Sequence, residues 1–354
     1  MKAWENNIRK VVPYVAGEQP NKDNMVKLNT NECPYPPSPN VRKVMEETDI
    51  NKFRLYPDTN AAPLVKELAG FYGVEEDMIF VGVGSDDVLA NAFLTFFNSD
   101  KPVLFPNITY SFYPVWADLY KIPYKTPLLD ENFHLVKEDY YVENGGIIFP
   151  NPNAPTSLME DLSVVEDIVA HNQSSVVIID EAYVDFGGVS ALPLVEKYEN
   201  LLVVQTFSKS RSMAGMRIGF AIGNKALIKA MNDVKFSINS YTMNYTSIIA
   251  GAEAVKDREY FKAVCSKIIT TREKTKERLK ERGFSFPDSK TNFIFATNDK
   301  LNITELFEYL RSKDVFVRHW DSPLIKDYLR ITIGTDEEMD ILFKYVDEFI
   351  KENM

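Results

Sequence analysis

The chain has 354 residues, 45% of them hydrophobic and 26% charged, which is the composition of an ordinary globular protein. The formal net charge of -11 argues against nucleic acid and anionic membranes as partners, because both select a basic face. The only cysteines, Cys33 and Cys265, form neither a disulfide framework nor a zinc-type pair, so we expect no bound metal. With no signal-peptide core and no run long enough to cross a membrane, the sequence predicts a cytoplasmic protein.

Short apolar runs alternate with helix-like segments between residues 40 and 254, at the spacing of βα units. In chain order these runs are MIFVGVG (78–84), PVLFP (102–106), GIIFP (146–150), SVVIID (175–180), LLVVQ (201–205) and IGFAIG (218–223). The pattern predicts an α/β fold in which a mostly parallel sheet lies between two layers of helices. We assign residues 40–254 to a large ligand-binding domain.

The last third of the chain has a different pattern. A long charged helix is predicted over 257–283, and the order strand, helix, strand, helix follows over 292–297, 303–314, 328–334 and 336–353. Thr335 and Glu338 have the spacing of a capping box at the start of the last helix. We predict a small α+β domain made of residues 1–39 and 255–354, which includes an N-terminal arm and a connecting helix.

Polar and aromatic residues follow the first two apolar runs. In an open parallel sheet, ligands bind beyond the carboxyl ends of the strands, so these residues are expected to lie close together. Ser85 and Asp86 stand at a predicted helix start, where free backbone N–H groups could hold a phosphate, although a capped glycine turn also explains this stretch. Tyr110 could stack on a flat ring there, and core packing is the alternative.

Three further candidates follow the third and fourth runs. Asn153, in the turn NPNAPTS, offers an amide to a ring oxygen, or is simply a loop residue. Asp180 ends a strand that is predicted to be buried, where a carboxylate is costly unless it meets a positive charge. That charge is either an internal Lys or Arg or a protonated ring nitrogen of a cofactor, and Tyr183 could touch the same ring.

The segment TFSKSRSMAGMRIGF (206–220) follows the fifth run. A lone loop lysine is usually a surface residue, but the Lys209 amine could also form a Schiff base with an aldehyde. Thr206 and Ser208 suit a close approach to phosphate, which the Arg217 guanidinium could grip bidentately. Phosphate donors, a stacking ring, a buried acid and this lysine together match the needs of pyridoxal 5′-phosphate, whereas the P-loop and dinucleotide motifs are missing.

These motifs resemble those of the histidinol-phosphate aminotransferases, a class-II family of the fold-type I pyridoxal-phosphate-dependent transferases. The resemblance runs nearly from end to end, through PYVAGEQ, KLNTNECPYPPSP, LYPD, GVGSDD, PNITYSFY, NPNAPTS, IIDEAY, TFSKSRSMAGMRIGF, VFVRHW and YLRITIGT. It implies an enzyme of histidine biosynthesis that transfers an amino group from L-histidinol phosphate to 2-oxoglutarate, giving imidazole acetol phosphate and glutamate.

The resemblance also implies roles at the cofactor. Lys209 becomes the Schiff-base lysine, Asp180 the partner of the pyridine nitrogen and Tyr183 the contact of the ring oxygen. The phosphate would be held by Ser208, Arg217 and backbone groups of Ser85 and Asp86, and Tyr110 would stack on the ring. Tyr56, in LYPD, would reach the phosphate from the other subunit, so the resemblance implies a homodimer with shared active sites.

The substrate would meet residues from both ends of the chain. Arg330 corresponds to the family's binder of the substrate carboxylate, whereas its position in the strand YLRITIG alone also fits an exposed edge arginine. Arg318 is expected nearby and could help to bind a second anionic group. Tyr14 and Tyr35 are candidates for contact with the imidazole ring.

The sequence departs from the family pattern at three positions. Ala154 replaces the asparagine that contacts the ring oxygen, Ser157 replaces a glycine, and Cys33 replaces a polar residue near the substrate entrance; Asn153 could take over the lost contact. An aromatic-amino-acid aminotransferase and a threonine-phosphate decarboxylase of the same fold remain alternatives. A non-catalytic binding protein and a nicotinamide-dependent dehydrogenase are more distant ones.

Overall fold

A computed structural model of the chain describes residues 2–353. Seven strands form a central sheet in the order β2-β8-β7-β6-β5-β3-β4. Their bounds are Ile79–Gly82 (β2), Val103–Leu104 (β3), Tyr124–Lys125 (β4), Gly146–Pro150 (β5), Val177–Asp180 (β6), Leu201–Thr206 (β7) and Gly219–Gly223 (β8). Every predicted run overlaps one of these strands. The sheet is mostly parallel, as predicted, and β8 is antiparallel to both of its neighbours.

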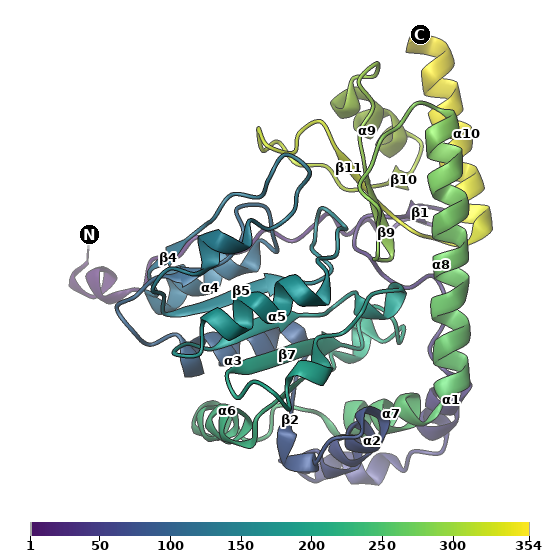
Figure 1. Cartoon of the computed structure of the whole chain (residues 1–354). Helices are drawn as coiled ribbons and strands as arrows, with labels where there is room; N and C mark the ends of the chain where they lie inside the picture. Colours follow the sequence, from purple (N-terminus) through teal and green to yellow (C-terminus); the bar gives the residue numbers. More distant parts are fainter. Residues whose placement is uncertain (1, 354) are drawn as a thin grey trace.

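Helices cover both faces of this sheet (Figure 1). One face carries α3 (Ser85–Phe96), α4 (Phe112–Tyr120) and α6 (Lys225–Ile238), and the other carries α2 (Ala62–Tyr72), α5 (Leu162–His171) and α7 (Tyr245–Lys256). Neighbouring strand residues face opposite layers, because Ile148 packs with the first set and Phe149 with α5. The strands are therefore apolar on both sides, as expected for a buried parallel sheet.

A smaller assembly of strands and helices lies beside the sheet (Figure 1). It contains β9 (Phe293–Ala296) antiparallel to β11 (Leu329–Thr332), and β1 (Val26–Lys27) parallel to β10 (Val315–Phe316). Its helices are α8 (Arg258–Glu281), α9 (Ile303–Ser312) and α10 (Asp336–Asn353). The predicted capping box is present, because Glu338 N–H donates to Thr335 Oγ1 at 3.2 Å and Thr335 N–H donates to Glu338 Oε2 at 2.7 Å.

The remaining elements are short. They are α1 (Pro39–Glu46) and the 3-10 helices η1 (Ala3–Asn7), η2 (Ile50–Arg54), η3 (Glu76–Met78), η4 (Lys137–Tyr140), η5 (Val184–Phe186), η6 (Leu192–Leu194) and η7 (Ala214–Met216). Among residues 2–353, no helix combines the length and the apolar character needed to cross a membrane. The two-domain division at residues 40 and 254 stays a prediction.

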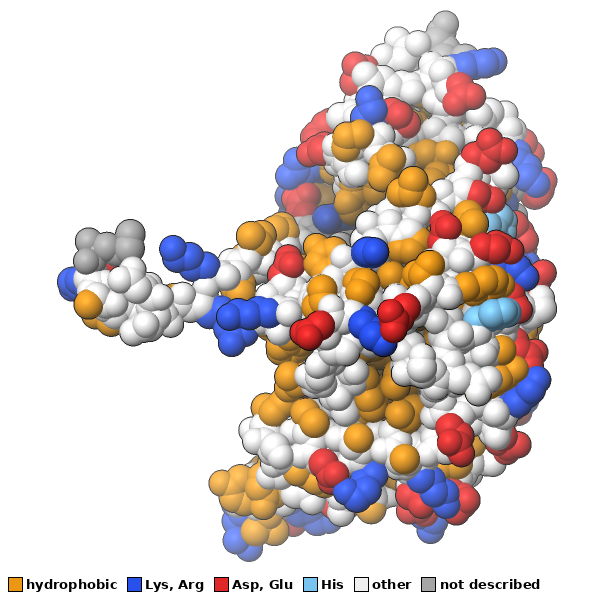
Figure 2. Space-filling model, turned by 60° about the vertical axis from the view of Figure 1, so that its left-hand side comes forward, with side chains coloured by type: hydrophobic (Ala, Val, Ile, Leu, Met, Phe, Trp, Pro, Cys, Tyr) orange, Lys and Arg blue, Asp and Glu red, His pale blue; other side chains and the backbone are white. Residues whose placement is uncertain are grey.

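The N-terminal arm projects from the body of the molecule (Figure 1). In the view of Figure 2 it stands beside a hollowed face on which hydrophobic side chains gather. Twelve of the twenty exposed large hydrophobic side chains lie in just three segments, 4–15, 50–56 and 236–241. Such a concentration of exposed apolar surface is typical of an interaction surface.

Arg272, in α8, connects the two parts of the molecule. Its side chain is only 3% exposed, and Nη1 donates to the carbonyl oxygens of Phe186 at 2.7 Å and Thr291 at 2.8 Å. Phe186 belongs to the loop after β6, and Thr291 lies just before β9. This arginine therefore fixes the small sheet relative to the large one.

We expect Arg272→Leu to lower the free energy of unfolding by about 2 to 3 kcal/mol, because it leaves two buried carbonyl groups without a donor. Urea denaturation of the cofactor-free protein measures this loss. Lys274→Ala is the matched control on the same helix, since Lys274 makes an exposed ion pair with Asp336, and it should cost less than about 0.5 kcal/mol. Equal losses in the two variants would contradict the bridging role.

Candidate active site

A cavity of about 180 Å³ lies beyond the carboxyl ends of the central strands, where the sequence predicts the ligand crevice. Nine of the predicted cofactor residues line it: Ser85, Asp86, Tyr110, Asp180, Tyr183, Thr206, Ser208, Lys209 and Arg217. They come from the segments that follow β2, β3, β6 and β7, which meet at one edge because these strands run in the same direction. Lys209 Nζ donates to the carbonyl oxygen of Thr30 at 3.0 Å and lies 5.8 Å from the centre of the Tyr183 ring.

Asp180 is the buried acid of this cavity, with 5% of its surface exposed. Oδ2 accepts a hydrogen bond from the Tyr113 hydroxyl at 3.1 Å, and Oδ1 accepts one from Ala182 N–H at 3.2 Å. Burial raises the pKa of Asp180 to about 6, although these two hydrogen bonds act in the opposite direction. Within residues 2–353 its hydrogen-bond donors are neutral, so the structure gives no support to an internal Lys or Arg partner.

The opposite end of the cavity is built to hold an anion. Gly84 has φ +88°, and a Cβ atom there would lie 2.5 Å from Arg217 Nη2, so only glycine lets the turn approach the guanidinium this closely. The turn leads into α3, whose first N–H groups face this end. Ser208 N–H donates to Thr206 Oγ1 at 3.1 Å, and the Thr206 hydroxyl lies within hydrogen-bond distance of both Ser208 Oγ (3.0 Å) and Ile218 O (3.2 Å), so the two hydroxyl groups are held together at this end.

Asp86 organises two of these groups. Its carboxylate accepts a hydrogen bond from the Tyr110 hydroxyl at 2.7 Å and pairs with Arg217 Nη2 at 3.2 Å. Burial and this carboxylate raise the pKa of Tyr110 well above its ordinary value, so the phenol stays protonated. Anion donors, an aromatic ring, an unpaired buried carboxylate and a primary amine therefore fit the phosphate, ring, ring nitrogen and aldehyde of pyridoxal phosphate.

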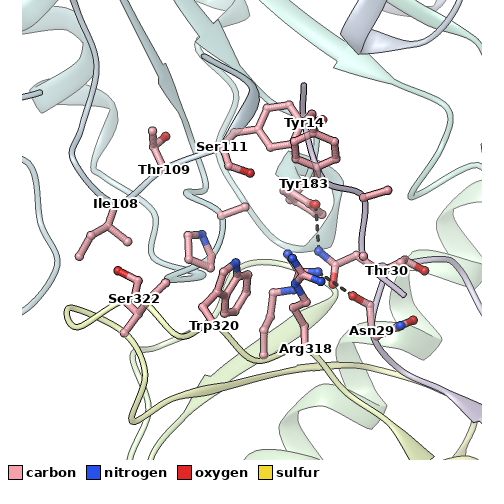
Figure 3. A pocket seen from close by; sticks show the side chains of 18 of the residues that line it. Tyr14, Asn29, Thr30, Ile108, Thr109, Ser111, Tyr183, Arg318, Trp320 and Ser322 are labelled. Atoms are coloured by element: carbon pink, nitrogen blue, oxygen red, sulfur yellow. Dashed lines mark hydrogen bonds between the residues drawn. The ribbon is translucent and has the colours of Figure 1, made fainter. Parts of the chain in front are cut away.

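A second cavity of about 420 Å³ adjoins the first, since Lys209 and Tyr183 line both. Figure 3 shows this second cavity with Tyr183 beside it. Arg318 and Arg330 both line this second cavity, and an antiparallel β-bridge pairs their backbones. Their guanidinium groups lie 5.4 and 5.3 Å from the centre of the Trp320 ring. Arg330 Nη2 donates to Asn29 O at 2.7 Å, its Nε has no partner, and burial lowers its pKa. Among the described residues neither arginine makes an ion pair, so both remain available for an anion.

Aromatic and hydroxyl groups line the rest of this cavity. Figure 3 shows Tyr14, Thr109, Ser111 and Ser322 around it. Tyr14 comes from the N-terminal segment, and its ring stacks on that of Phe112 with the centroids 4.1 Å apart. The cavity therefore combines a cationic end with surfaces suited to a flat polar ring.

Three predicted site residues lie elsewhere. Tyr35 lines neither cavity and packs against the hydrophobic cluster around β9 and β11, with Lys267 Nζ 5.2 Å from its ring. Its contact with substrate stays a prediction. Asn153 also lines neither cavity. Its Nδ2 donates to Ile108 O and Thr156 Oγ1, and its Oδ1, which has no partner among the described residues, can only accept a hydrogen bond. Its contact with the ring oxygen stays a prediction. Tyr56 is 82% exposed and reaches neither cavity of its own chain.

The two departures in the NPNAPTS turn have different consequences. Ala154 lines both cavities and presents only a methyl group to them. Ser157 is fully buried with φ +68°, the left-handed region that favours glycine, and this explains the glycine of the family pattern. Cys33 lies against the small-domain core and lines neither cavity.

Sequence reasoning missed Tyr113, Thr30 and Asn31. Tyr113 holds Asp180, Thr30 accepts from Lys209, and Asn31 Nδ2 donates to the Tyr183 hydroxyl at 2.9 Å. In the sequence, nothing distinguishes Tyr113 from an aromatic residue of the core. The other two reach the site from a segment about 150 residues or more away in sequence, and no local pattern marks such a contact.

Comparison with known proteins agrees with this geometry. Residues 23–346 match the model of the family "Aminotransferase class I and II". The chain belongs to the class I and II aminotransferase family. Proteins named histidinol-phosphate aminotransferase are 50% identical to this aminotransferase in Lactococcus lactis subsp. cremoris (349 residues, 99% of this chain and 98% of that one) and in Brachyspira hyodysenteriae (345 residues, 97% of each).

A solved structure extends the comparison to three dimensions. Histidinol-phosphate aminotransferase from Sinorhizobium meliloti, in complex with pyridoxal-5′-phosphate, superimposes with a TM-score of 0.83 at 22% identity, over 92% of this chain and 90% of that one. At that identity the likeness shows the fold, and it confirms the predicted fold-type I architecture of this aminotransferase.

In this aminotransferase, Asp180→Asn should stabilise the cofactor-free protein at neutral pH. The folded-state pKa of Asp180 is about 6, above its ordinary value of 3.8. Protonated Asp180 therefore gives the folded protein its full stability below pH 3.8, and this stability is lost as the pH rises through 6 and the carboxylate ionises. We expect a gain of about 2 to 3 kcal/mol at pH 7.5 and about 1 kcal/mol at pH 4.5, measured by urea denaturation.

Asp233→Asn is the control, since this exposed carboxylate on α6 should change stability by less than about 0.5 kcal/mol at both pH values. A pH-independent effect of Asp180→Asn would mean that the acid is not held in a costly charged state.

Proposed function

We propose that the protein is a pyridoxal-phosphate-dependent histidinol-phosphate aminotransferase, which moves an amino group from L-histidinol phosphate to 2-oxoglutarate. The observation that carries this proposal is the pair Arg318 and Arg330, unpaired among the described residues, in a cavity that adjoins the Lys209 amine. Two guanidinium groups suit a phosphate dianion, and the 50% identical relatives named for this activity support the same substrate. An aminotransferase of histidine biosynthesis is expected in the cytoplasm.

Each end of the smaller cavity would hold one part of the cofactor. Arg217, Ser208 and the first N–H groups of α3 would bind its phosphate, Tyr110 would stack on its ring, and Asp180 would pair with its ring nitrogen. Pyridoxal phosphate, when bound, supplies an electron-accepting ring that stabilises negative charge on a substrate carbon. The charged Asp180 carboxylate favours the protonated ring nitrogen, because the pair removes the cost of burying either charge alone.

Lys209 is the group that moves the proton. It lines both cavities, so its amine can reach the cofactor aldehyde and also the amine-bearing carbon of a substrate held by the arginines. Nζ would take the proton from that carbon and deliver it to the carbon that carried the aldehyde, on the other side of the shared nitrogen. Thr30 O, which accepts from Nζ at 3.0 Å, holds the lysine at this junction.

The two substrates would use the same cationic end. Histidinol phosphate presents a phosphate there, and 2-oxoglutarate presents a carboxylate, so Arg330 and Arg318 would bind each in turn. The imidazole ring would then face the aromatic and hydroxyl groups around Tyr14. An aromatic amino acid, with one carboxylate and no phosphate, would leave one of the two guanidinium groups without an anion.

The test is a half-reaction titration of the loaded protein. We expect L-histidinol phosphate at micromolar concentration to convert the pyridoxal absorbance to the pyridoxamine form, and phenylalanine to need at least about 100-fold more, because a lost charge-assisted pair costs about 3 kcal/mol. Arg318→Leu should weaken histidinol phosphate more than phenylalanine. Lys209→Ala should abolish both conversions.

Conversion by phenylalanine alone would move the function to the aromatic aminotransferases. Release of carbon dioxide from threonine phosphate would indicate a decarboxylase. A protein with no pyridoxal absorbance would refute the proposal as a whole.

The protein would act as a homodimer with shared active sites. The arm and the hollowed face are surfaces of one chain, so a twofold axis can place each arm against the partner, as an isologous interface requires (Figure 2). Tyr56 lies within this apolar surface, and its ring is 4.6 Å from that of Tyr241, also exposed. We place Tyr56 in the partner's phosphate site, since it reaches neither cavity of its own chain.

Hybrid dimers test this arrangement. Lys209→Ala chains are inactive, and Tyr56→Ala chains should bind cofactor about tenfold more weakly. At a cofactor concentration that loads wild-type sites but not Tyr56→Ala sites, co-expression of the two should restore about a quarter of wild-type activity, because half of the dimers are hybrids with one complete site each. The control is co-expression of Lys209→Ala chains with Arg330→Ala chains. It should restore no activity, since Arg330 acts in the site of its own chain. No restoration with Tyr56→Ala, or a monomer by light scattering, would refute the shared site.

A further inference from the structure

Three consecutive residues of the N-terminal segment each contact a different side chain of the site. Asn29 O accepts from Arg330 Nη2 at 2.7 Å, and Thr30 O accepts from Lys209 Nζ at 3.0 Å. Asn31 Nδ2 donates to the Tyr183 hydroxyl at 2.9 Å, a bond drawn as a dashed line in Figure 3. Only Asn31 uses its side chain, so it is the one contact that a substitution can change without moving the backbone.

The small sheet holds Asn31 firmly. Asn31 is 1% exposed, and its N–H donates to Thr332 Oγ1 at 3.1 Å. The Thr332 hydroxyl donates to Asn31 Oδ1 at 3.0 Å, and Asn292 Nδ2 donates to Asn31 O at 3.0 Å. Because Oδ1 is occupied by β11, Nδ2 is directed towards Tyr183.

The direction of this bond decides what Tyr183 can do. A phenol has a single proton and can accept one hydrogen bond while donating another. If Asn31 donates, the Tyr183 proton is free to point into the cavity. If Tyr183 donated to Asn31 instead, its oxygen would face a ring oxygen without a proton between them, and the two lone pairs would repel.

We propose that Asn31 is a positioning residue that turns the Tyr183 proton towards the ring oxygen of the cofactor. The proposal rests on the proposed function, because it needs a pyridoxal ring in the cavity. It gains weight from Ala154, which presents a methyl group where the family pattern has an asparagine at that oxygen. Tyr183 therefore stands alone at a contact that the family pattern shares between two donors.

Asn31 also connects this contact with substrate binding. Thr332 follows Arg330 by two residues on β11, so both side chains lie on one face of the strand. The strand that carries the anion-binding arginine thus also fixes the amide that orients Tyr183. The proposed substrate contact of Arg330 and the orientation of Tyr183 therefore both depend on β11.

Asn31→Asp tests the direction of the bond. Aspartate has nearly the same shape and tolerates the φ of +55° at this position, but its carboxylate only accepts hydrogen bonds and should draw the Tyr183 proton away from the cavity. We expect cofactor affinity of the apoprotein, measured by fluorescence titration, to fall about tenfold, as in Tyr183→Phe. The pH at which the loaded protein changes absorbance should rise in both variants, because an anionic ring oxygen has lost its donor.

The double variant separates orientation from general damage. If Asn31 acts through the Tyr183 proton, Asn31→Asp in a Tyr183→Phe background should cost nothing more. Asn31→Gly keeps the left-handed backbone and removes the side-chain amide. If Asn31→Asp does not fold, the same comparison with Tyr183→Phe is made with Asn31→Gly. Wild-type affinity and absorbance in Asn31→Asp, or additive losses in the double variants, would overturn the proposal. Wild-type protein that binds no pyridoxal phosphate would instead refute the proposed function.

Discussion

The buried carboxylate of Asp180 is the constraint on which the site depends. It stands at the carboxyl end of a strand whose side chains are buried on both faces, so water cannot solvate its charge. Two neutral donors, Tyr113 and Ala182 N–H, lower the cost without removing it, and the pKa stays near 6. A cation that binds in the cavity beside this carboxylate would remove the remaining cost, because the pair avoids burying either charge alone.

Around that acid, the residues that we propose for the cofactor and those that we propose for the substrate come from different parts of the chain. The groups for the cofactor come from the ends of strands in one sheet, which the packed layers of helices hold in place. The groups for the substrate come from β11 and from the N-terminal segment, which meet the sheet through side-chain contacts such as those of Arg272 and Asn31.

The sequence was informative where chemistry and local structure coincide. Asp180, Ser208 and Lys209 directly follow or end apolar runs, so the rule for parallel sheets was enough to bring them together. Nothing in the sequence predicts that β8 is antiparallel to its neighbours, because an apolar run does not show the direction of its strand. Asn153 and Tyr35 line neither cavity for a related reason: the position of a motif predicts which loop a residue occupies, whereas hydrogen bonds and packing decide where its side chain points.

The contacts that sequence could not supply are those that set proton positions. Tyr113, Thr30 and Asn31 are ordinary residue types in ordinary places, and they matter because the fold brings each within hydrogen-bond distance of a residue that we propose for the site. Ala154, which stands where the family pattern has an asparagine, makes these hydrogen bonds more important, since it leaves the cavity wall with one donor fewer. A chain that keeps the lysine, the acid and the arginines, and loses one donor at the ring oxygen, depends more strongly on the orientation of the donor that remains.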